Sequence, residues 1–347
     1  MLSGRIIFFK ASVLACMVGF FLSCDPKNPQ GCFPNDKLTP YVEPLTDFGQ
    51  RAEWSIDGKK VYFVDSAGGD IWMVDVDSKK VKQITKPSYR PDGHGYYRIL
   101  CMSNGDLLLT CGPERYKLYM QVMDKSLKKP PIDIPEEQIN EGPAISRKSM
   151  KIAWSPDHKT IYTGEISYQE GKPSILNKKL IIDNKNIVVD SIKYEDILEP
   201  QDFRPPSDDE LIWSQYGKTS KGVFSSEVMG YDLITGEMVN YSRAPEQYDE
   251  PEGIFPDGNF TLVECDKHNP KGTAYIDIYK LKLDLNDPRY ERLIYFSDTK
   301  GFRSSNPVVI NDGKKIAFQA SIAGSAAGAG CGLYLFDLEK WEAEKQK

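Results

Sequence analysis

A turn motif that returns along the chain limits the possible folds more than any other feature of this sequence. Within residues 52–63 (AEWSIDGKKVYF), two alternating runs of apolar and polar residues flank Asp57-Gly58. An Asp-Gly pair between alternating runs is the strongest short-range signal of a β-hairpin. Related turns return about every fifty residues, as in repeat architectures, at residues 103–105, 155–158, 206–209, 255–258 and 311–313.

Further alternating runs follow most of these turns. The expected second strands are residues 59–65, 159–165, 259–265 and 314–320, and the expected third strands are residues 70–76, 116–122, 227–233, 275–281 and 332–338. Fourth strands such as residues 81–85 and 291–297 complete the unit. Four antiparallel strands repeated at this period are typical of propeller blades. The sequence therefore predicts an all-β fold, a six-bladed β-propeller of four-stranded antiparallel blades.

The last repeat stops after its third strand and is followed only by the charged tail EKWEAEKQK. Residues 41–46 (YVEPLT) precede the first repeat and resemble the fourth strands elsewhere. We expect this N-terminal strand to pair with the final blade and close the ring, because closure removes an exposed sheet edge. Two smaller expectations concern connections: a short helical turn at residues 194–198, and a flexible loop or lid at residues 324–330 (GSAAGAG).

The repeat resembles a known family. The pattern W-S-x-D-G-K-K-x-x-F at residues 54–63, with third strands of the type I-x-x-x-D, is similar to the TolB-like (WD40-like repeat) six-bladed propellers. The resemblance covers about residues 38–341 and implies the fold. It leaves the activity open, because this family uses the fold for protein partners, for glycan-active enzymes and for substrate gating.

The first 23 residues resemble a bacterial lipoprotein signal peptide. Arg5 and Lys10 precede an apolar run of thirteen residues, which is too short to span a bilayer, and Cys24 follows Leu22-Ser23. This predicts lipidation of Cys24, a tether at residues 24–37 and a propeller at residues 38–347. The expected location is the bacterial cell envelope, facing the periplasm or the cell surface. A simple signal anchor and cleavage at Cys16 are the alternatives.

Charge and cysteines exclude some classes of partner and bond. The net charge is −6, with 50 acidic and 44 basic residues, so we expect no nucleic-acid partner.

After Cys16 and Cys24 are set aside, the chain has no C-x-x-C pair. We expect the remaining cysteines to be buried free thiols, with Cys32 unpaired, and the ring to close without disulfides. These cysteines are Cys32, Cys101, Cys111, Cys265 and Cys331.

The funnel face of a propeller carries the loops between second and third strands and the connections between blades, where ligands usually bind. The fifth repeat is richest in polar residues there, because EPEG precedes its first strand and ECDKHN follows its second. His158 is expected on the opposite face, with a structural role. A charged rim that only keeps the protein soluble is the alternative. The candidate ligand-binding residues are Glu250, Glu252, Asp266, Lys267, His268, Arg303, Glu141 and His94.

No cofactor is firmly predicted. A divalent ion such as Mn²⁺ or Ca²⁺ would find imidazole and carboxylate ligands in His268, Asp266 and Glu252, with His94 as a further candidate. Among similar propellers, the oligogalacturonate lyases use a His-rich metal site to neutralise a uronate carboxylate. With three histidines in the whole chain, this sequence does not match that pattern.

The sequence favours binding over catalysis. It contains no G-x-S-x-G, H-E-x-x-H, P-loop or G-x-G-x-x-G motif, and it assigns no catalytic residue. We expect a membrane-anchored propeller whose funnel binds a glycan, such as an oligosaccharide, or an envelope protein. The alternative is a glycan-active enzyme, either a uronate lyase or a glycoside hydrolase with a carboxylate pair drawn from Glu141, Glu165, Asp202 and Glu252. A scaffold similar to TolB is a further alternative.

Overall fold

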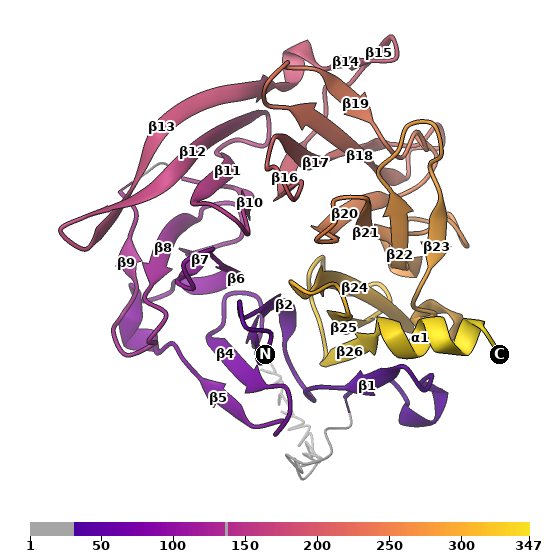
Figure 1. Cartoon of the computed structure of the whole chain (residues 1–347), viewed down its shortest axis with the longest axis horizontal. Coiled ribbons are helices and arrows are strands. Elements are labelled where there is room, and N and C mark those ends of the chain that lie inside the picture. The colour runs from indigo at the N-terminus through magenta and orange to yellow at the C-terminus, as the bar shows by residue number, and fades with distance from the viewer. Residues whose placement is uncertain (1–30, 136–137) are drawn as a thin grey trace, which may run out of the picture.

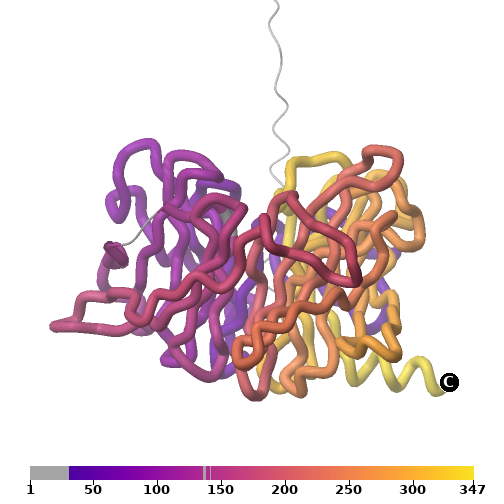
Figure 2. Tube along the Cα trace, turned by 90° about the horizontal axis from the view of Figure 1, so that it is seen from above, coloured from indigo at the N-terminus to yellow at the C-terminus, as the bar shows by residue number. Residues whose placement is uncertain are grey.

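The computed structural model describes residues 31–135 and 138–347. They form six four-stranded antiparallel sheets arranged as blades around a central axis (Figure 1), which confirms the predicted propeller. Seen from the side, the ring is a thick disc with the C-terminal helix at its lower face (Figure 2). Among the described residues, no helix is long and apolar enough to cross a bilayer.

Each blade runs from an inner strand at the axis to an outer strand at the rim. The first blade consists of β2 (Gln50–Trp54), β3 (Lys60–Val64), β4 (Ile71–Asp75) and β5 (Val81–Gln83). The second consists of β6 (Gly95–Cys101), β7 (Leu107–Gly112), β8 (Tyr119–Met123) and β9 (Ile132–Asp133). The third consists of β10 (Glu141–Ile145), β11 (Lys151–Ser155), β12 (Thr160–Gln169) and β13 (Lys172–Asp183).

The other three blades follow the same plan. The fourth blade consists of β16 (Leu198–Phe203), β17 (Glu210–Lys218), β18 (Phe224–Asp232) and β19 (Met238–Asn240). The fifth consists of β20 (Asp249–Ile254), β21 (Phe260–Cys265), β22 (Asp277–Lys282) and β23 (Tyr290–Arg292). The sixth consists of β24 (Phe302–Val309), β25 (Lys315–Ile322) and β26 (Leu333–Asp337) with β1 (Val42–Pro44) as its outer strand. Short 3₁₀ helices occupy connections: η1 (Asn35–Lys37), η2 (Pro87–Tyr89), η3 (Asn184–Asn186), η4 (Thr273–Tyr275) and η5 (Phe296–Asp298).

Apolar side chains fill the spaces between neighbouring blades. Between the sixth and first blades, for example, Trp54 and Phe63 pack with Val308 and Leu333. The Trp54 indole also donates to the Val308 carbonyl at 3.0 Å. Trp154 is likewise buried, between the second and third blades. Because each blade buries both of its faces, the core is continuous around the ring and holds the inner strands in place.

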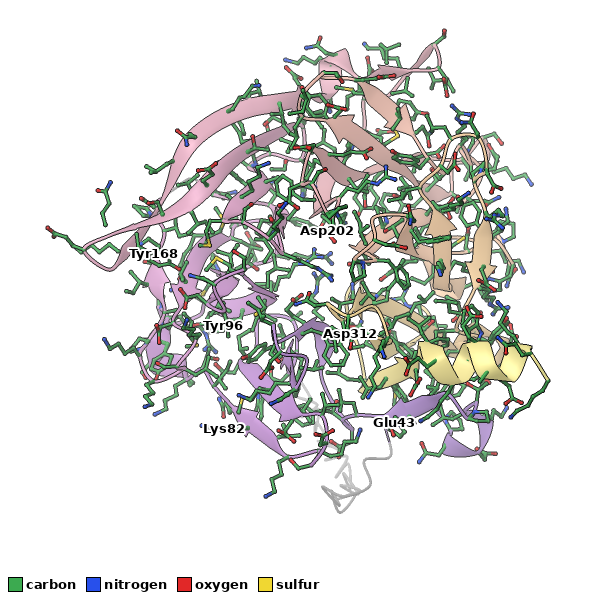
Figure 3. The ribbon with its side chains drawn as sticks, in the orientation of Figure 1. Glu43, Lys82, Tyr96, Tyr168, Asp202 and Asp312 are labelled. Atoms are coloured by element: carbon green, nitrogen blue, oxygen red, sulfur yellow. A yellow bond between two sulfur atoms is a disulfide. The ribbon has the colours of Figure 1, made fainter. Side chains whose placement is uncertain are left out.

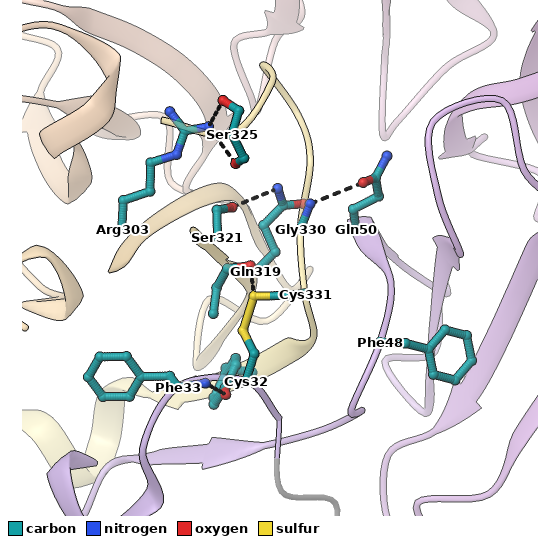
Figure 4. Close-up of a disulfide and its surroundings, with 12 residues drawn as sticks. Cys32, Phe33, Phe48, Gln50, Arg303, Gln319, Ser321, Ser325, Gly330 and Cys331 are labelled. Atoms are coloured by element: carbon teal, nitrogen blue, oxygen red, sulfur yellow. Dashed lines mark hydrogen bonds between the residues drawn. A yellow bond between two sulfur atoms is a disulfide. The ribbon is translucent and has the colours of Figure 1, made fainter. Parts of the chain in front are cut away.

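The ring closes as predicted, through the N-terminal strand. β1 pairs antiparallel with β26, with Val42 opposite Phe336 and Pro44 opposite Tyr334. The expectation of closure without a disulfide is wrong, since Cys32 and Cys331 are bonded across a separation of 299 residues (Figure 4). The reason is tertiary: the segment before β1 folds back along the sixth blade, which brings the two cysteines together. The other three cysteines are buried free thiols, as expected.

The register of the third blade differs from the prediction. Its first turn is residues 146–150, where the Ser146 amide donates to the Lys151 carbonyl just as Ser55 does to Lys60 in the first blade. Residues 155–158 instead join the second and third strands, β11 and β12. The run around Glu165, expected as a second strand, is therefore a third strand. The Asp157 carboxylate accepts from the Lys159 and Thr160 amides. A turn held in this way can join the first and second strands of a blade or the second and third strands equally well.

Two connections also differ. The expected helical turn at residues 194–198 is absent, because the chain forms the small hairpin of β14 (Val188–Val189) and β15 (Ile192–Lys193) and then enters β16. The charged tail forms the helix α1 (Leu338–Lys345). The Asp337 carboxylate caps the first turn of α1, and Trp341 packs against Phe336. A capped segment rich in Glu and Lys favours such a helix.

Candidate functional site

The inner strand of every blade contains a β-bulge. The register with the second strand shifts between Gln50 and Glu53, Tyr96 and Arg98, Glu141 and Ala144, Pro200 and Asp202, Pro251 and Gly253, and Ser305 and Val308. A bulge turns side chains away from the regular alternation and is common beside functional sites. Here the bulges direct a ring of polar side chains toward the axis. Two of these residues, Arg51 and Asn306, have a left-handed backbone, with φ of 54° and 46°.

A cavity of about 380 Å³ opens above these bulges on the funnel face. Loops from the second, third, fourth, fifth and sixth blades contribute to its wall, together with the inner strands. Its principal polar and aromatic residues are Arg51, Arg98, Arg115, Tyr116, His158, Glu199, Tyr216, Phe224, Tyr248, Glu250, Glu252, Glu264, Arg303 and Asn306. Three of the predicted ligand-binding residues, Glu250, Glu252 and Arg303, line this cavity.

Arg98 joins three blades at the floor of this cavity. Its guanidinium donates to Glu199 at 3.1 Å, to Glu252 at 3.2 Å and to the Gln201 side-chain oxygen at 3.4 Å. Glu199 and Gln201 belong to β16 and Glu252 to β20, whereas Arg98 is on β6. A guanidinium suits this position because its donors form a planar fork that can serve several acceptors at once.

Three carboxyl groups meet beside Arg98. One oxygen from each of Glu250, Glu252 and Glu264 lies within 4.8 Å of the other two. Asn306 helps to hold them, with its side-chain amide 3.0 Å from Glu252 and its backbone amide 2.6 Å from Glu264. These contacts tie β20 and β21 to β24.

Burial raises the pKa of all three glutamates, and their mutual repulsion adds to the shift. For Glu252 the pKa rises to about 8, because burial and the charges of Glu250 and Glu199 outweigh the opposing effect of Arg98. Burial and the charge of Glu199 raise the pKa of Glu250. The pKa of Glu264 lies well above its usual range, from burial and the charge of Glu250. The cluster therefore retains protons at neutral pH.

Aromatic rings form one wall of the cavity. Tyr216 stacks on Phe224 with ring centroids 5.3 Å apart, and Tyr248 lies 5.9 Å from Phe224. The Tyr216 hydroxyl has one proton to donate and lies 2.5 Å from a Glu250 carboxyl oxygen and 2.9 Å from one of Glu199, and the Tyr248 hydroxyl also donates to Glu250. Phe224 has no polar group and remains 45% exposed. It offers an open ring face at the mouth.

The glycine-rich loop at residues 324–330 lies along the opposite edge of the cavity, to which Ala327 and Gly328 contribute. Arg303 donates to the carbonyls of Ser325 at 3.2 Å and Ala326 at 3.3 Å. The Gly330 amide donates to the Gln50 side chain at 3.0 Å (Figure 4). The loop is thus held by side chains from the first and sixth blades.

Four predicted residues lie away from the cavity. The two ring nitrogens of His268 contact the Tyr279 hydroxyl at 2.9 Å and the Ser297 hydroxyl at 2.7 Å. Asp266 is buried and accepts from the amides of Tyr248 and Gly272. The remaining two residues contact neighbouring aromatic rings: Lys267 contacts Tyr290, and His94 contacts Tyr119.

The expected metal ligands consequently do not meet. His268 and Asp266 are engaged within the fifth blade and its connection, whereas Glu252 points to the axis. Glu141 begins β10, but its side chain lies outside the described residues. The donor set that does converge is the three-carboxylate cluster of Glu250, Glu252 and Glu264. Oxygen ligands of this kind would suit Ca²⁺ or Mn²⁺ rather than a metal that prefers nitrogen or sulfur.

His158 is on the funnel face, contrary to the prediction, because its turn joins β11 to β12. The imidazole lines the cavity and lies edge-on to Tyr116 at 5.4 Å between centroids. Its Nε2 atom is buried without a hydrogen-bond partner in the described structure. Burial, together with the charge of Arg115, lowers the pKa of His158. The ring is therefore neutral at physiological pH.

A narrower space of about 50 Å³ continues below the cavity along the axis. Glu53, Arg147 and Asp202 line it, and Asp202 lies close to the centre of the ring (Figure 3). Burial raises the pKa of Glu53 to about 7 and that of Asp202 to about 6, in each case against the opposing effect of Arg147. This channel has room for water or a small ion.

Most residues of the cavity floor were not predicted from the sequence. Arg51, Arg98, Glu199 and Glu264 lie within alternating strands, where charged residues are expected to face solvent. One signal was available: Pro or Gly accompanies several bulges, at Gly142-Pro143, Pro200, Pro251 and Pro307. Proline cannot donate to a ladder and marks bulges or edges, so the charged neighbours of these prolines were candidates for the axis.

No protein-family model matches the chain, and no curated protein matches it in sequence. Solved structures do match its fold. TolB from Agrobacterium tumefaciens is 14% identical, with a TM-score of 0.51 over 74% of this chain and 79% of that one. An oligogalacturonate lyase in complex with manganese is 15% identical, with a TM-score of 0.50 over 86% and 78%.

A puromycin-hydrolysing peptidase from Mycobacterium tuberculosis also matches, at 10% identity and a TM-score of 0.50, but this chain covers only 45% of its length. At these identities the likeness shows the fold alone. It agrees with the resemblance seen in the repeat motif, and it leaves the function to be argued from the cavity.

Proposed function

We propose that this TolB-like propeller binds the end of a glycan in its funnel cavity, and that a lipid on Cys24 holds it in the bacterial cell envelope. One observation carries the proposal: a single cavity combines an aromatic wall with a floor of arginine and glutamate side chains. Sugars present both an apolar ring face and a dense set of hydroxyl groups, so they use both kinds of surface. The volume is that of a small-molecule cleft.

The cavity favours a glycan over a folded protein. A protein partner would bury a broad surface of about 800 Å² on each side, whereas the converging polar groups here line a recessed cavity of about 380 Å³. Only a chain end or a single side chain of a protein could reach Arg98 and the glutamates. A terminal sugar residue fits the same volume and pairs with more of these groups.

Binding is also favoured over catalysis by the protonation of the tyrosines and by the positions of the acidic residues. Burial raises the pKa of Tyr216 and Tyr248 well above its usual range, and both hydroxyls donate to Glu250. Neither tyrosine is poised to accept a proton. Of the acids considered for a glycosidase whose side chains the structure describes, only Glu252 lines the cavity, since Glu165 is in the third strand β12 and Asp202 lines the narrower space below.

A uronate lyase remains the second candidate because of the three-carboxylate cluster. Glu250, Glu252 and Glu264 could hold Mn²⁺ or Ca²⁺, and a bound ion would neutralise the carboxylate of a uronic acid. Arg98 and Arg303 line the same cavity and could orient the substrate. The oligogalacturonate lyase that shares this fold was solved with manganese.

The test is a thermal-shift titration with neutral and uronic oligosaccharides, with and without Mn²⁺ or chelator. A ligand at a hundred times its Kd should stabilise the protein by about 2.7 kcal/mol. Phe224→Ala should weaken binding about 5- to 30-fold through lost stacking, since a ring contact and its buried area are worth about 1–2 kcal/mol. Ile234→Ala, on an exposed turn of the same blade, is the matched control.

No shift with any sugar, or equal binding by both variants, would contradict the glycan site. Release of an unsaturated product from a uronic oligosaccharide, abolished by chelator and by Glu252→Gln, would instead establish the lyase.

A further inference from the structure

We infer that the funnel mouth faces the membrane to which the chain is anchored. The inference rests on the proposed lipidation of Cys24, and it adds the orientation of the cavity, which that proposal leaves open. Three observations carry it: the place where the N-terminal segment joins the propeller, the length of chain between that place and Cys24, and the side chains exposed on the funnel loops.

The N-terminal segment joins the propeller at the funnel rim. Cys32 is bonded to Cys331, which directly follows the glycine-rich loop over the cavity (Figure 4). Phe33 stacks on Phe296 at 3.7 Å between centroids, and Phe296 lies in the connection between the fifth and sixth blades. The Phe33 amide also donates to the Tyr334 hydroxyl at 2.9 Å. A covalent bond and buried packing therefore fix this junction at the funnel face.

From this junction the chain runs to the opposite face before it returns as β1. Val42 pairs near the end of β26, opposite Phe336, and Pro44 pairs near its start, opposite Tyr334. β1 thus runs toward the funnel face. The described chain consequently begins, at Gly31, on the side of the disc that carries the cavity, and not on the side that carries α1.

The tether is short compared with the disc. Cys24 and Cys32 are eight positions apart in the sequence, and a fully extended chain of this length spans at most about 29 Å. The strand β25 contains eight residues between the two faces, which corresponds to about 26 Å at the rise of a strand. If the opposite face lay on the membrane, the tether would need nearly its full length to pass the side of the blade. If the funnel faces the membrane, the tether has to span only the distance between the funnel rim and the membrane surface.

In this orientation the funnel loops present exposed aromatic side chains to the membrane surface. Tyr116, Phe224 and Tyr275 are 52%, 45% and 38% exposed, and each lies in or beside the loop between the second and third strands of its blade. Aromatic residues of this kind are enriched where proteins meet the interfacial region of a bilayer. Lys221 and Lys271 lie in two of the same loops. A glycan that enters the cavity would then come from the membrane side.

The test uses the full-length lipidated protein, inserted from outside into phosphatidylcholine vesicles that contain an acceptor-labelled lipid. A donor dye is attached either at Lys221→Cys, on the funnel loop of the fourth blade, or at Asp312→Cys, on the opposite turn of the sixth blade. Both positions are exposed, and the free cysteines of the described chain are buried. We expect strong loss of donor fluorescence at position 221 and little at position 312.

Equal loss at the two positions, or greater loss at position 312, would overturn the orientation. A Cys32→Ser/Cys331→Ser double variant should reduce the difference between the positions, because the tether would then leave from a less restricted point. A protein that carries no lipid and does not float with the vesicles would overturn the anchor and the orientation together. The glycan site would be unaffected by either result, since the thermal-shift titration tests it separately.

Discussion

At the scale of single residues, the cavity depends on charges that are buried together. Arg98 serves acceptors on two other blades, and three glutamates share a volume in which their full ionisation would be costly. Glu199 and Glu252 are both strongly shielded from solvent, with side chains 4% and 6% exposed. The arrangement survives because every group has a partner and because the glutamates retain protons. Removal of one partner should therefore have a large effect.

Arg98→Met should lower the free energy of unfolding by about 3–5 kcal/mol, because it leaves the Glu199 carboxylate buried without its cation. Urea denaturation gives this quantity directly. Arg289→Ala is the control, since the Arg289 side chain is 66% exposed and pairs only with Asp287 among the described residues; it should change stability by less than about 1 kcal/mol. Similar losses in the two variants would argue against a buried charge network.

The raised pKa of Glu252 predicts that stability falls as pH rises from 6.5 to 8. Between its unfolded value of 4.5 and its folded value of about 8, the folded state holds a proton that the unfolded state releases, so each increase in pH favours unfolding. The lowered histidine pKa values act in the opposite direction, but only below pH 6.5. Glu252→Gln should flatten the slope measured by urea unfolding at several pH values. A slope equal to that of the wild type would refute the assignment.

At the scale of elements, two devices join the chain ends. The strand β1 completes the sixth blade, and the Cys32–Cys331 bond holds the segment before it. The bond links positions 299 residues apart, so it restricts nearly the whole unfolded chain. The glycine-rich loop beside Cys331 is tied to Arg303 and Gln50, which couples this junction to the edge of the cavity.

The Cys32→Ser/Cys331→Ser double variant should lose about 2–5 kcal/mol of unfolding free energy, because the reduced chain has more freedom when unfolded. The measurement is urea denaturation with and without dithiothreitol. Reductant should shift the wild-type midpoint to lower urea and leave the double variant unchanged. A reductant effect of the same size in both proteins would show that the disulfide is not the cause.

At the scale of the whole molecule, stability comes from a closed ring in which each blade packs on two neighbours. Without β1, strand β26 would present an unpaired edge at one point of the ring. If residues 41–45 are removed, Leu333 and Asp337 also lose their backbone hydrogen bonds to Leu45 and Tyr41, which measure 2.7 and 2.8 Å. An open edge of this kind promotes association between chains.

A chain that begins at Gly49 and carries Cys331→Ser should therefore unfold at lower urea than the Cys32→Ser/Cys331→Ser variant and should form oligomers. Both chains lack the disulfide, so the comparison isolates the contribution of β1 and its flanking packing. Size-exclusion chromatography and urea denaturation supply the two measurements. A monomer with the midpoint of the double variant would mean that β1 contributes little to closure.

Local patterns in the sequence predicted the repeat, the number of blades and the closing strand. These features depend on turn residues and on alternation within a few positions, so they can be read directly. Of the residues predicted in the fifth blade, Glu250 and Glu252 line the cavity. His268 and Asp266 were not brought to it, because their side chains bond within their own blade and its connection.

Only the tertiary structure decided the register of the third blade, the disulfide and the composition of the cavity. An Asp turn forms equally well in two hairpins, so residues 155–158 could not reveal which strands they join, and the face occupied by His158 followed from that. Cys32 and Cys331 meet because the ring brings the chain ends together. Arg98, Glu199 and Glu264 converge because bulges in separate blades turn them toward one axis, and no local pattern records a distance across that axis.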